Sequence, residues 1–290
     1  MYWILLSLGA GLFNSATGVF KKRGGLKQLD PYTIAWSVAF FSLFILVPAT
    51  IIKGIPQISA SFWWALLVSG SLNALATTLQ VKALLKSDMS LIGPLQATTP
   101  FFIIFSAFIL LKEVPTILGL VGIIILIVGS YFLQYKRKAS LFAPFKALLE
   151  DKGARLVFGA ALIWGITGTV DKIGVQSSSS VFWSMFVNAL MALILFPIVI
   201  GFGNNRGIKD LFSYKKLKNL VPLGLFTSLM SIFQMTALTM ANVAYVVSLK
   251  RTSALTDVLF GKLFFKEPNI KSRALGATLI VIGVILISIN

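Results

Sequence analysis

Cysteine and histidine are both absent from this chain of 290 residues. Their absence excludes disulfides, thiolate chemistry and the usual ligands of zinc and haem, so no catalytic, metal or cofactor site is predicted. Charged residues are also scarce, at 12% of the chain, against about 25% in typical soluble domains. Hydrophobic residues make up 57%, and the mean hydropathy is +0.89. An ordinary soluble domain is therefore excluded.

Apolar runs of about 20 residues recur along the whole chain, each long enough to cross the hydrocarbon core of a bilayer. The first run, MYWILLSLGAGLF, has no basic segment before it and no small-residue cleavage site, which predicts a retained helix rather than a signal peptide. We therefore expect an all-α integral membrane protein with ten transmembrane helices. The expected spans are 2–20, 32–52, 62–85, 89–111, 115–135, 153–175, 180–200, 219–240, 242–265 and 270–289.

The two halves of the sequence resemble each other. A charged segment, KRKASLFAPFKALLEDK at 136–152, is predicted to be a loop connecting a first five-helix repeat (1–135) to a second (153–290). Because five is odd, the second repeat must enter the membrane from the opposite side, which gives an inverted repeat with a site near the bilayer midplane. An offset of 154 residues pairs Gly70 with Gly224, Gln80 with Gln234, Thr98 with Thr252, Glu113 with Glu267, Gly122 with Gly276 and Gly129 with Gly283, and an offset of 151 pairs Phe13 with Trp164 and Lys21 with Lys172.

The formal net charge of +17 is concentrated in short loops between the apolar runs. Basic residues in such loops set membrane topology and meet anionic lipid head groups, so nucleic acid is not an expected partner. Loops after the odd-numbered spans carry KKRGGLK, KRK and RGIKDLFSYKKLK, while loops after even-numbered spans carry almost no lysine or arginine. The positive-inside rule then predicts that both termini lie outside the cytoplasm.

Four stretches carry a resemblance to a known family: IWGITGTVDKIG, ANVAYVVSLKRTSALTDVLFGKLFFKE, LGATLIVIGVILI and, in the first half, LLKEVPTILGLVGIIILIVGSYFL. With ten helices in two repeats, the chain resembles the EamA-type transporters of the drug/metabolite transporter (DMT) superfamily. The resemblance implies a multi-pass protein of the cell (plasma or inner) membrane that transports small molecules and is not an enzyme. Relatives include exporters of amino acids and drugs and importers of metabolites. Many are thought to keep both termini in the cytoplasm, which leaves the orientation open.

Lys250 and Arg251 stand side by side within the predicted span 242–265. Lys250 is about 12 Å from the start of that helix, too deep to reach the membrane surface easily. A charge at that depth costs about 2.5–3.5 kcal/mol on insertion scales, so the pair requires a partner or water. In one interpretation Asp171 neutralises the pair and locks two helices together. In the other the pair faces a central cavity and binds an anionic group, as a Lys-Arg pair does in the triose-phosphate translocators that the sequence resembles here.

Two acidic residues are candidates for coupling transport to protons. Asp257 is predicted to share a helix face with Lys250 and Ser253, and it could hold a proton in one state and pair with Lys250 in another. A contact to a neighbouring hydroxyl is the alternative role for Asp257. Asp171 is expected to pair with Lys172 or Lys250 before it acts as a proton carrier.

Other polar residues within the spans complete the predicted substrate site. The candidates for substrate binding are Lys250, Arg251, Ser253, Gln80, Gln96, Gln234 and Trp164. Gln80 and Gln234 occupy matching positions in the two repeats, whereas Gln96 and Ala97 replace the Lys-Arg pair in the first. Hydrogen bonds between helices would explain any one of the uncharged residues equally well.

Glycines in spans 115–135 and 270–289 predict close helix packing, either within one chain or in a homodimer. No ATPase motif is present, so transport must be driven by a gradient or by exchange. A membrane-embedded enzyme and a channel are disfavoured, because the sequence lacks a carboxylate cluster and a continuous polar stripe. We therefore predict a secondary transporter of small organic molecules, among them an anionic metabolite, that works by alternating access. A proton-coupled exporter of amino acids or drugs is the alternative.

Overall fold

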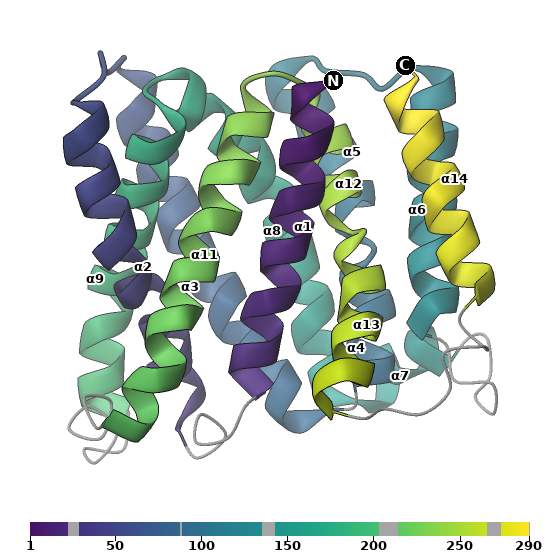
Figure 1. Cartoon of the computed structure of the whole chain (residues 1–290), viewed down its shortest axis with the longest axis horizontal. Coiled ribbons are helices and arrows are strands. Elements are labelled where there is room, and N and C mark those ends of the chain that lie inside the picture. The colour runs from purple at the N-terminus through teal and green to yellow at the C-terminus, as the bar shows by residue number, and fades with distance from the viewer. Residues whose placement is uncertain (23–28, 88, 135–142, 203–213, 266–273, 290) are drawn as a thin grey trace.

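A computed structural model describes residues 1–22, 29–87, 89–134, 143–202, 214–265 and 274–289, and these form a bundle of helices (Figure 1). Among them, seven helices are long and apolar enough to cross a membrane, and α6 and α14 are shorter apolar helices. The first half contains α1 (Tyr2–Lys22), α2 (Pro31–Lys53), α3 (Ser61–Lys86), α4 (Met89–Gln96), α5 (Thr99–Leu111), α6 (Ile117–Gln134) and α7 (Ala143–Glu150). The second contains α8 (Lys152–Gln176), α9 (Ser180–Phe202), α11 (Tyr214–Leu238), α12 (Val243–Lys250), α13 (Ser253–Phe265) and α14 (Ala274–Ser288).

The outer surface of the bundle is apolar, as expected of helices that face lipid. On α5, Phe105, Phe108 and Ile109 are each more than half exposed. In water such a continuous apolar surface would promote aggregation, whereas lipid solvates it. Both termini lie at the same end of the bundle in Figure 1, an end that we call the terminal face.

The two halves of the chain interlock rather than fold as separate units. Helix α1 packs on α11, α2 on α9, α3 on α8 and α6 on α14, so each of these pairs joins one half to the other. One large buried cluster runs through both halves, with Phe62 of α3 packed edge-on against Trp183 of α9. This interlocking places a central space between the halves.

Two predicted helices, over 89–111 and 242–265, are each interrupted by a turn, although the first still contains one apolar span long enough to cross a membrane, Gly93–Leu111. The first is divided into α4 and α5 and the second into α12 and α13, with the same offset of 154 residues between the two breaks. Thr98 and Thr252 occupy matching places in the breaks, and each hydroxyl donates to the carbonyl oxygen three residues earlier. The two repeats therefore share the positions of their helix breaks.

The two breaks have different local causes. Pro100 lies in the first turn of α5, where it has no N–H to donate to the carbonyl of Gln96 four residues earlier and so interrupts the helical hydrogen bonds. The second break contains no proline, and α1 stabilises it instead. The backbone of α1 comes so close at Gly11 that an added Cβ would lie 2.8 Å from the carbonyl oxygen of Lys250. Ser15 also donates a hydrogen bond of 2.9 Å to the carbonyl of Ser253. Helix α1 therefore packs directly against the second break.

The segment 136–152 was predicted to be a connecting loop, but it contains the short helix α7. Asp151 then caps α8 by accepting a hydrogen bond of 2.6 Å from the backbone N–H of Ala154. The Ser87 hydroxyl at the end of α3 donates to the same carboxylate oxygen. These hydrogen bonds, from Ser87 first and from Ala154 second, lower the pKa of Asp151 below its ordinary value. The cap thereby ties the start of the second repeat to α3.

Helices α6 and α14 meet along a line of glycines. An added Cβ on Gly276 would lie 2.4 Å from the backbone nitrogen of Leu133 and 2.7 Å from the carbonyl oxygen of Gly129. Gly122 and Gly283 meet in the same way about two helical turns further along the two helices. The predicted glycine packing thus joins two helices of one chain, while a homodimer through these helices stays a prediction.

A substitution in this glycine seam is expected to destabilise the protein. Gly276→Ala should lower the free energy of unfolding by about 1–3 kcal/mol, because the backbones must separate to admit one methyl group. Gly18→Ala is the control, since nothing lies within 4 Å of the position where its Cβ would be. Thermal unfolding of both variants, followed by size-exclusion chromatography, makes the comparison. Equal midpoints for Gly276→Ala and wild type would show that the seam is not tightly packed.

Candidate functional site

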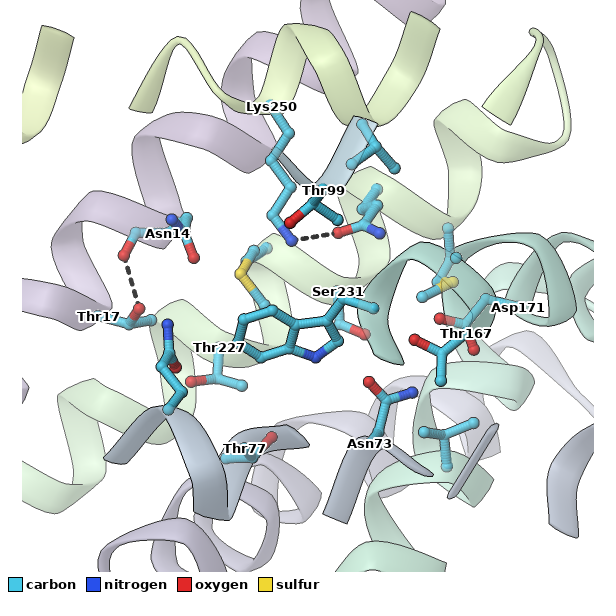
Figure 2. A pocket seen from close by; sticks show the side chains of 18 of the residues that line it. Asn14, Thr17, Asn73, Thr77, Thr99, Thr167, Asp171, Thr227, Ser231 and Lys250 are labelled. Carbon is cyan, nitrogen blue, oxygen red and sulfur yellow. Dashed lines mark hydrogen bonds between the residues drawn. The ribbon is translucent and has the colours of Figure 1, made fainter. Parts of the chain in front are cut away.

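A cavity of about 170 Å³ lies between the two halves, and both halves contribute polar side chains to its wall (Figure 2). The breaks of both discontinuous helices open onto it, through Gln96 and Thr99 on one side and Lys250 and Arg251 on the other. The predicted site residues that line the cavity are Gln80, Gln96, Trp164, Asp171, Gln234, Lys250 and Arg251.

Two predicted site residues lie elsewhere. Ser253 is buried against α1, where its hydroxyl accepts a hydrogen bond of 3.4 Å from Asn14. Asp257 is exposed on α13 and does not line the cavity. The expected helix face shared by Lys250, Ser253 and Asp257 does not form, because the helix ends at Lys250 and begins again at Ser253.

The cationic pair lies where α12 ends. The Lys250 ammonium reaches into the cavity and donates a hydrogen bond of 2.5 Å to the amide oxygen of Gln234, drawn as a dashed line from Lys250 in Figure 2. The Arg251 guanidinium reaches across to the first repeat, where its Nη2 donates a hydrogen bond of 2.6 Å to the Thr99 hydroxyl. Among the described residues, the buried Nε of Arg251 has no hydrogen-bond partner. Both cations thus donate hydrogen bonds to neutral groups, and the carboxylates of Asp171 and Asp257 also act on Lys250 and Arg251, respectively, through their charge.

Arg251 lies between two helix ends of opposite polarity, because it caps the C-terminus of α12, which favours a cation, and reaches the N-terminus of α5, which does not. Thr99, which accepts its hydrogen bond, is the first residue of α5. The N-terminus of a helix carries a partial positive charge, so a cation is disfavoured there and an anion is favoured. An anionic group between Arg251 and the start of α5 would satisfy both positive centres at once. The start of α5 and the Arg251 guanidinium together can therefore bind an anionic group.

Asp171 brings a carboxylate to another part of the cavity wall. Its Oδ1 accepts hydrogen bonds from the Ser69 hydroxyl of α3 and, at 3.1 Å, from the indole N–H of Trp183. Asp171 therefore does not pair with Lys172, while the positive charge of Lys250 acts on the Asp171 carboxylate, as one of the two interpretations of the sequence expected. The reason for Lys172 is geometric, since neighbouring residues on a helix point about 100° apart. Lys172 instead forms an ion pair with Glu113, a partner that the sequence reasoning missed.

The cavity also has a less polar wall, which contains the predicted Trp164 and three methionines that the sequence reasoning missed. Met191 of α9, Met230 and Met235 of α11, and Trp164 of α8 line it. Methionine side chains are flexible and polarisable, so such a wall adapts to apolar groups of different shape. Asn188 of α9 also lines the cavity, and an amide within the apolar run VFWSMFVNALMALILF was the signal that could have identified it.

Comparisons with known proteins agree with this architecture. One solved structure, a crystal structure of a protein, superposes with a TM-score of 0.78 over 99% of this chain and 97% of the other, at 16% sequence identity. That likeness establishes the fold alone. No curated protein sequence matches the chain significantly. The EamA-like transporter family matches twice, over residues 1–135 and 151–289, which are nearly the whole chain. The chain therefore belongs to the EamA-like transporter family, and it is a multi-pass membrane transporter rather than an enzyme.

Proposed function

We propose that the protein is a secondary transporter of small organic molecules that carry an anionic group, and that it works by alternating access. The observation that carries this proposal is the placement of Lys250 and Arg251 at a helix break that opens onto the cavity. A guanidinium fork and an ammonium together suit a carboxylate or a phosphate group. Discontinuous helices whose ends point at the substrate are the usual way in which inverted-repeat transporters build a binding site.

The proposed topology has ten membrane crossings in two inverted repeats of five. Helices α4 and α5 together make the fourth crossing, and α12 and α13 together make the ninth. The matched offsets of the two breaks and the position of both termini at one face support an even number of crossings. Loop charge supports a cell membrane in which the terminal face points away from the cytoplasm.

The size of the cavity favours a metabolite over a drug. Its volume of about 170 Å³ is smaller than the roughly 300–1,000 Å³ of sites for drug-sized ligands. Amide groups from both halves can donate to and accept from a small polar molecule, and Gln80 and Gln234 do so from matching positions of the two repeats. The methionines and Trp164 would contact its apolar part.

A thermal-shift screen of the purified protein tests the proposed substrate class. Inorganic phosphate, small organic phosphates, carboxylates and organic cations are the probes. We expect anionic probes to raise the unfolding temperature, because a ligand that binds only the folded state stabilises it by an amount that grows with the logarithm of its concentration relative to Kd. Stabilisation by cations alone would contradict the proposal.

A proton-coupled exporter of amino acids or drugs is a second candidate, and Asp171 is the observation that favours it. This carboxylate lies in the cavity wall, so a proton on it and a substrate in the cavity can influence each other directly. The position of Asp257 outside the cavity makes it the weaker coupling candidate. Transport measurements on variants of these residues separate the two functions.

A further inference from the structure

A group of contacts at the terminal face joins the two halves of the chain just beyond the cavity. The connection between α5 and α6, residues 112–116, meets the connection between α11 and α12, residues 239–242, and the end of α8 (Figure 1). Glu113 and Lys172 are at the centre of these contacts. We call this ion pair, with the backbone groups that it holds at 241 and 243, the terminal clamp.

The local backbone turns Glu113 toward the second half of the chain. Lys112, which follows the last residue of α5, has a φ of 56° in the left-handed region. Glycine is the usual residue there, and a side chain in this conformation is costly unless surrounding contacts maintain it. The turn lets the N–H of Glu113 bond the carbonyl of Ala107 at 3.2 Å, closing the end of α5. The turn therefore directs the Glu113 side chain toward the second half of the chain rather than into solvent.

Glu113 and Lys172 each hold two groups. The Glu113 carboxylate pairs with the Lys172 ammonium and accepts a hydrogen bond of 3.0 Å from the backbone N–H of Val243, the first residue of α12. The ammonium also donates a hydrogen bond of 2.7 Å to the carbonyl oxygen of Ala241. The side chain of Lys172 is only 7% exposed and that of Glu113 is 22% exposed. In the same region Tyr245 accepts a hydrogen bond of 2.9 Å from the N–H of Thr116.

The clamp lies next to the cavity, on the side of the terminal face. Lys172 follows Asp171, which lines the cavity, and Val243 precedes the lining residue Val247 by four residues, or about 6 Å of helix. Helix α12 therefore has the clamp at one end and the Lys250–Arg251 pair at the other. A displacement of its start at the clamp would move the anion site at its end.

We propose that the terminal clamp closes the terminal-face end of the cavity and must open in each transport cycle, and that it positions α12 for anion binding in the closed state. This inference rests on the proposed alternating-access function. An ion pair suits such a role, because the cost of desolvating the charges offsets most of their attraction, so it can open without a large loss. Two states that differ by a few kcal/mol are what a transporter requires.

The test uses the natural absence of cysteine. A single Ser231→Cys substitution places a thiol in the cavity wall, and a membrane-impermeant maleimide applied to vesicles reports access to it. A separate Tyr2→Cys reporter identifies the vesicles in which the terminal face points outward, because Tyr2 is 79% exposed at the N-terminus. Glu113→Gln and Lys172→Met are then introduced singly into the Ser231→Cys protein. Glutamine keeps an oxygen that can accept from Val243 while removing the charge.

Either substitution should make labelling from the terminal face about tenfold faster, a coupling of the size typical between two conformational states. Labelling from the opposite face should become slower or stay unchanged, because the population shifts toward the state open at the terminal face. The matched control is the Lys146–Glu150 pair of α7, whose side chains are 72% and 66% exposed. Lys146→Met and Glu150→Gln should leave both rates unchanged.

Unchanged labelling in both clamp variants would overturn the inference, and so would equal acceleration by the control variants. Faster labelling from both faces would indicate loosened folding and would also count against a gate. A failure of the proposed anion transport can be distinguished from a failure of the proposed gate. If the clamp variants shift labelling as expected but no anionic probe stabilises the protein, the anion assignment fails and the gate stands.

Discussion

Lys250→Gln is expected to lower kcat/KM for uptake of a small organic anion by about 100-fold, the effect of removing one partner of a buried charged contact. Glutamine retains a hydrogen-bond donor for the amide oxygen of Gln234, so the cavity wall should keep its shape. What is lost is the positive charge. The loss should be larger for phosphates, which carry more charge, than for monocarboxylates.

The measurement is uptake into proteoliposomes of the anion that most strongly stabilises the wild-type protein. Lys82→Gln is the matched control, because Lys82 is a partly buried lysine of α3 that contacts Tyr32 and does not line the cavity. Unchanged anion transport in Lys250→Gln, or an equal loss in Lys82→Gln, would eliminate a binding role for Lys250.

If the second candidate function is correct, Asp171→Asn is expected to abolish accumulation driven by a pH gradient while leaving exchange of substrate for substrate in place. The asparagine oxygen can still accept the hydrogen bonds of Ser69 and Trp183, so the fold around it should be retained. Only the ability to take up and release a proton disappears. Exchange requires no net proton movement, so a carrier that has lost its proton site still performs it.

The two activities are measured in the same proteoliposome preparation, first with a pH gradient and then with unlabelled substrate inside and no gradient. Asp257→Asn provides the comparison, since Asp257 is an exposed carboxylate on α13 outside the cavity. If Asp257→Asn loses gradient-driven uptake and Asp171→Asn keeps it, coupling runs through α13, and the role assigned to Asp171 is wrong.

The membrane class, the repeat and the family could be predicted from the sequence because they depend on patterns spread over many residues. Apolar runs and the constant offset between the two repeats remain recognisable even where a single position is ambiguous. The cavity residues Gln80, Gln96, Gln234 and Lys250 could be selected for the same reason, since polar side chains within apolar spans need a shared polar space.

The helix breaks were harder to predict. Pro94 and Pro100 flank the first break and gave a usable signal, but the second break has Ser248 and Ala254 at the matching positions. Transferring the first break to the second through the repeat would have located it. It would also have shown that Asp257 does not share a face with Lys250.

Partners of charged residues were the least predictable feature. Asp171 and Lys172 are adjacent in sequence, yet they point to different neighbours, one to Ser69 and Trp183 and the other to Glu113. Glu113 lies 59 residues away from Lys172 in an interhelical connection. Such contacts depend on which helices pack together, and no local pattern in the sequence contains that information.

The central claim is that one anion site is reached alternately from the two faces of the membrane. Labelling of the Ser231→Cys thiol by an impermeant maleimide, in vesicles of both orientations and with or without the stabilising anion, tests it most directly. The account predicts labelling from each face and a change in both rates when the anion is bound. Labelling from one face only, or rates that no anion alters, would contradict it.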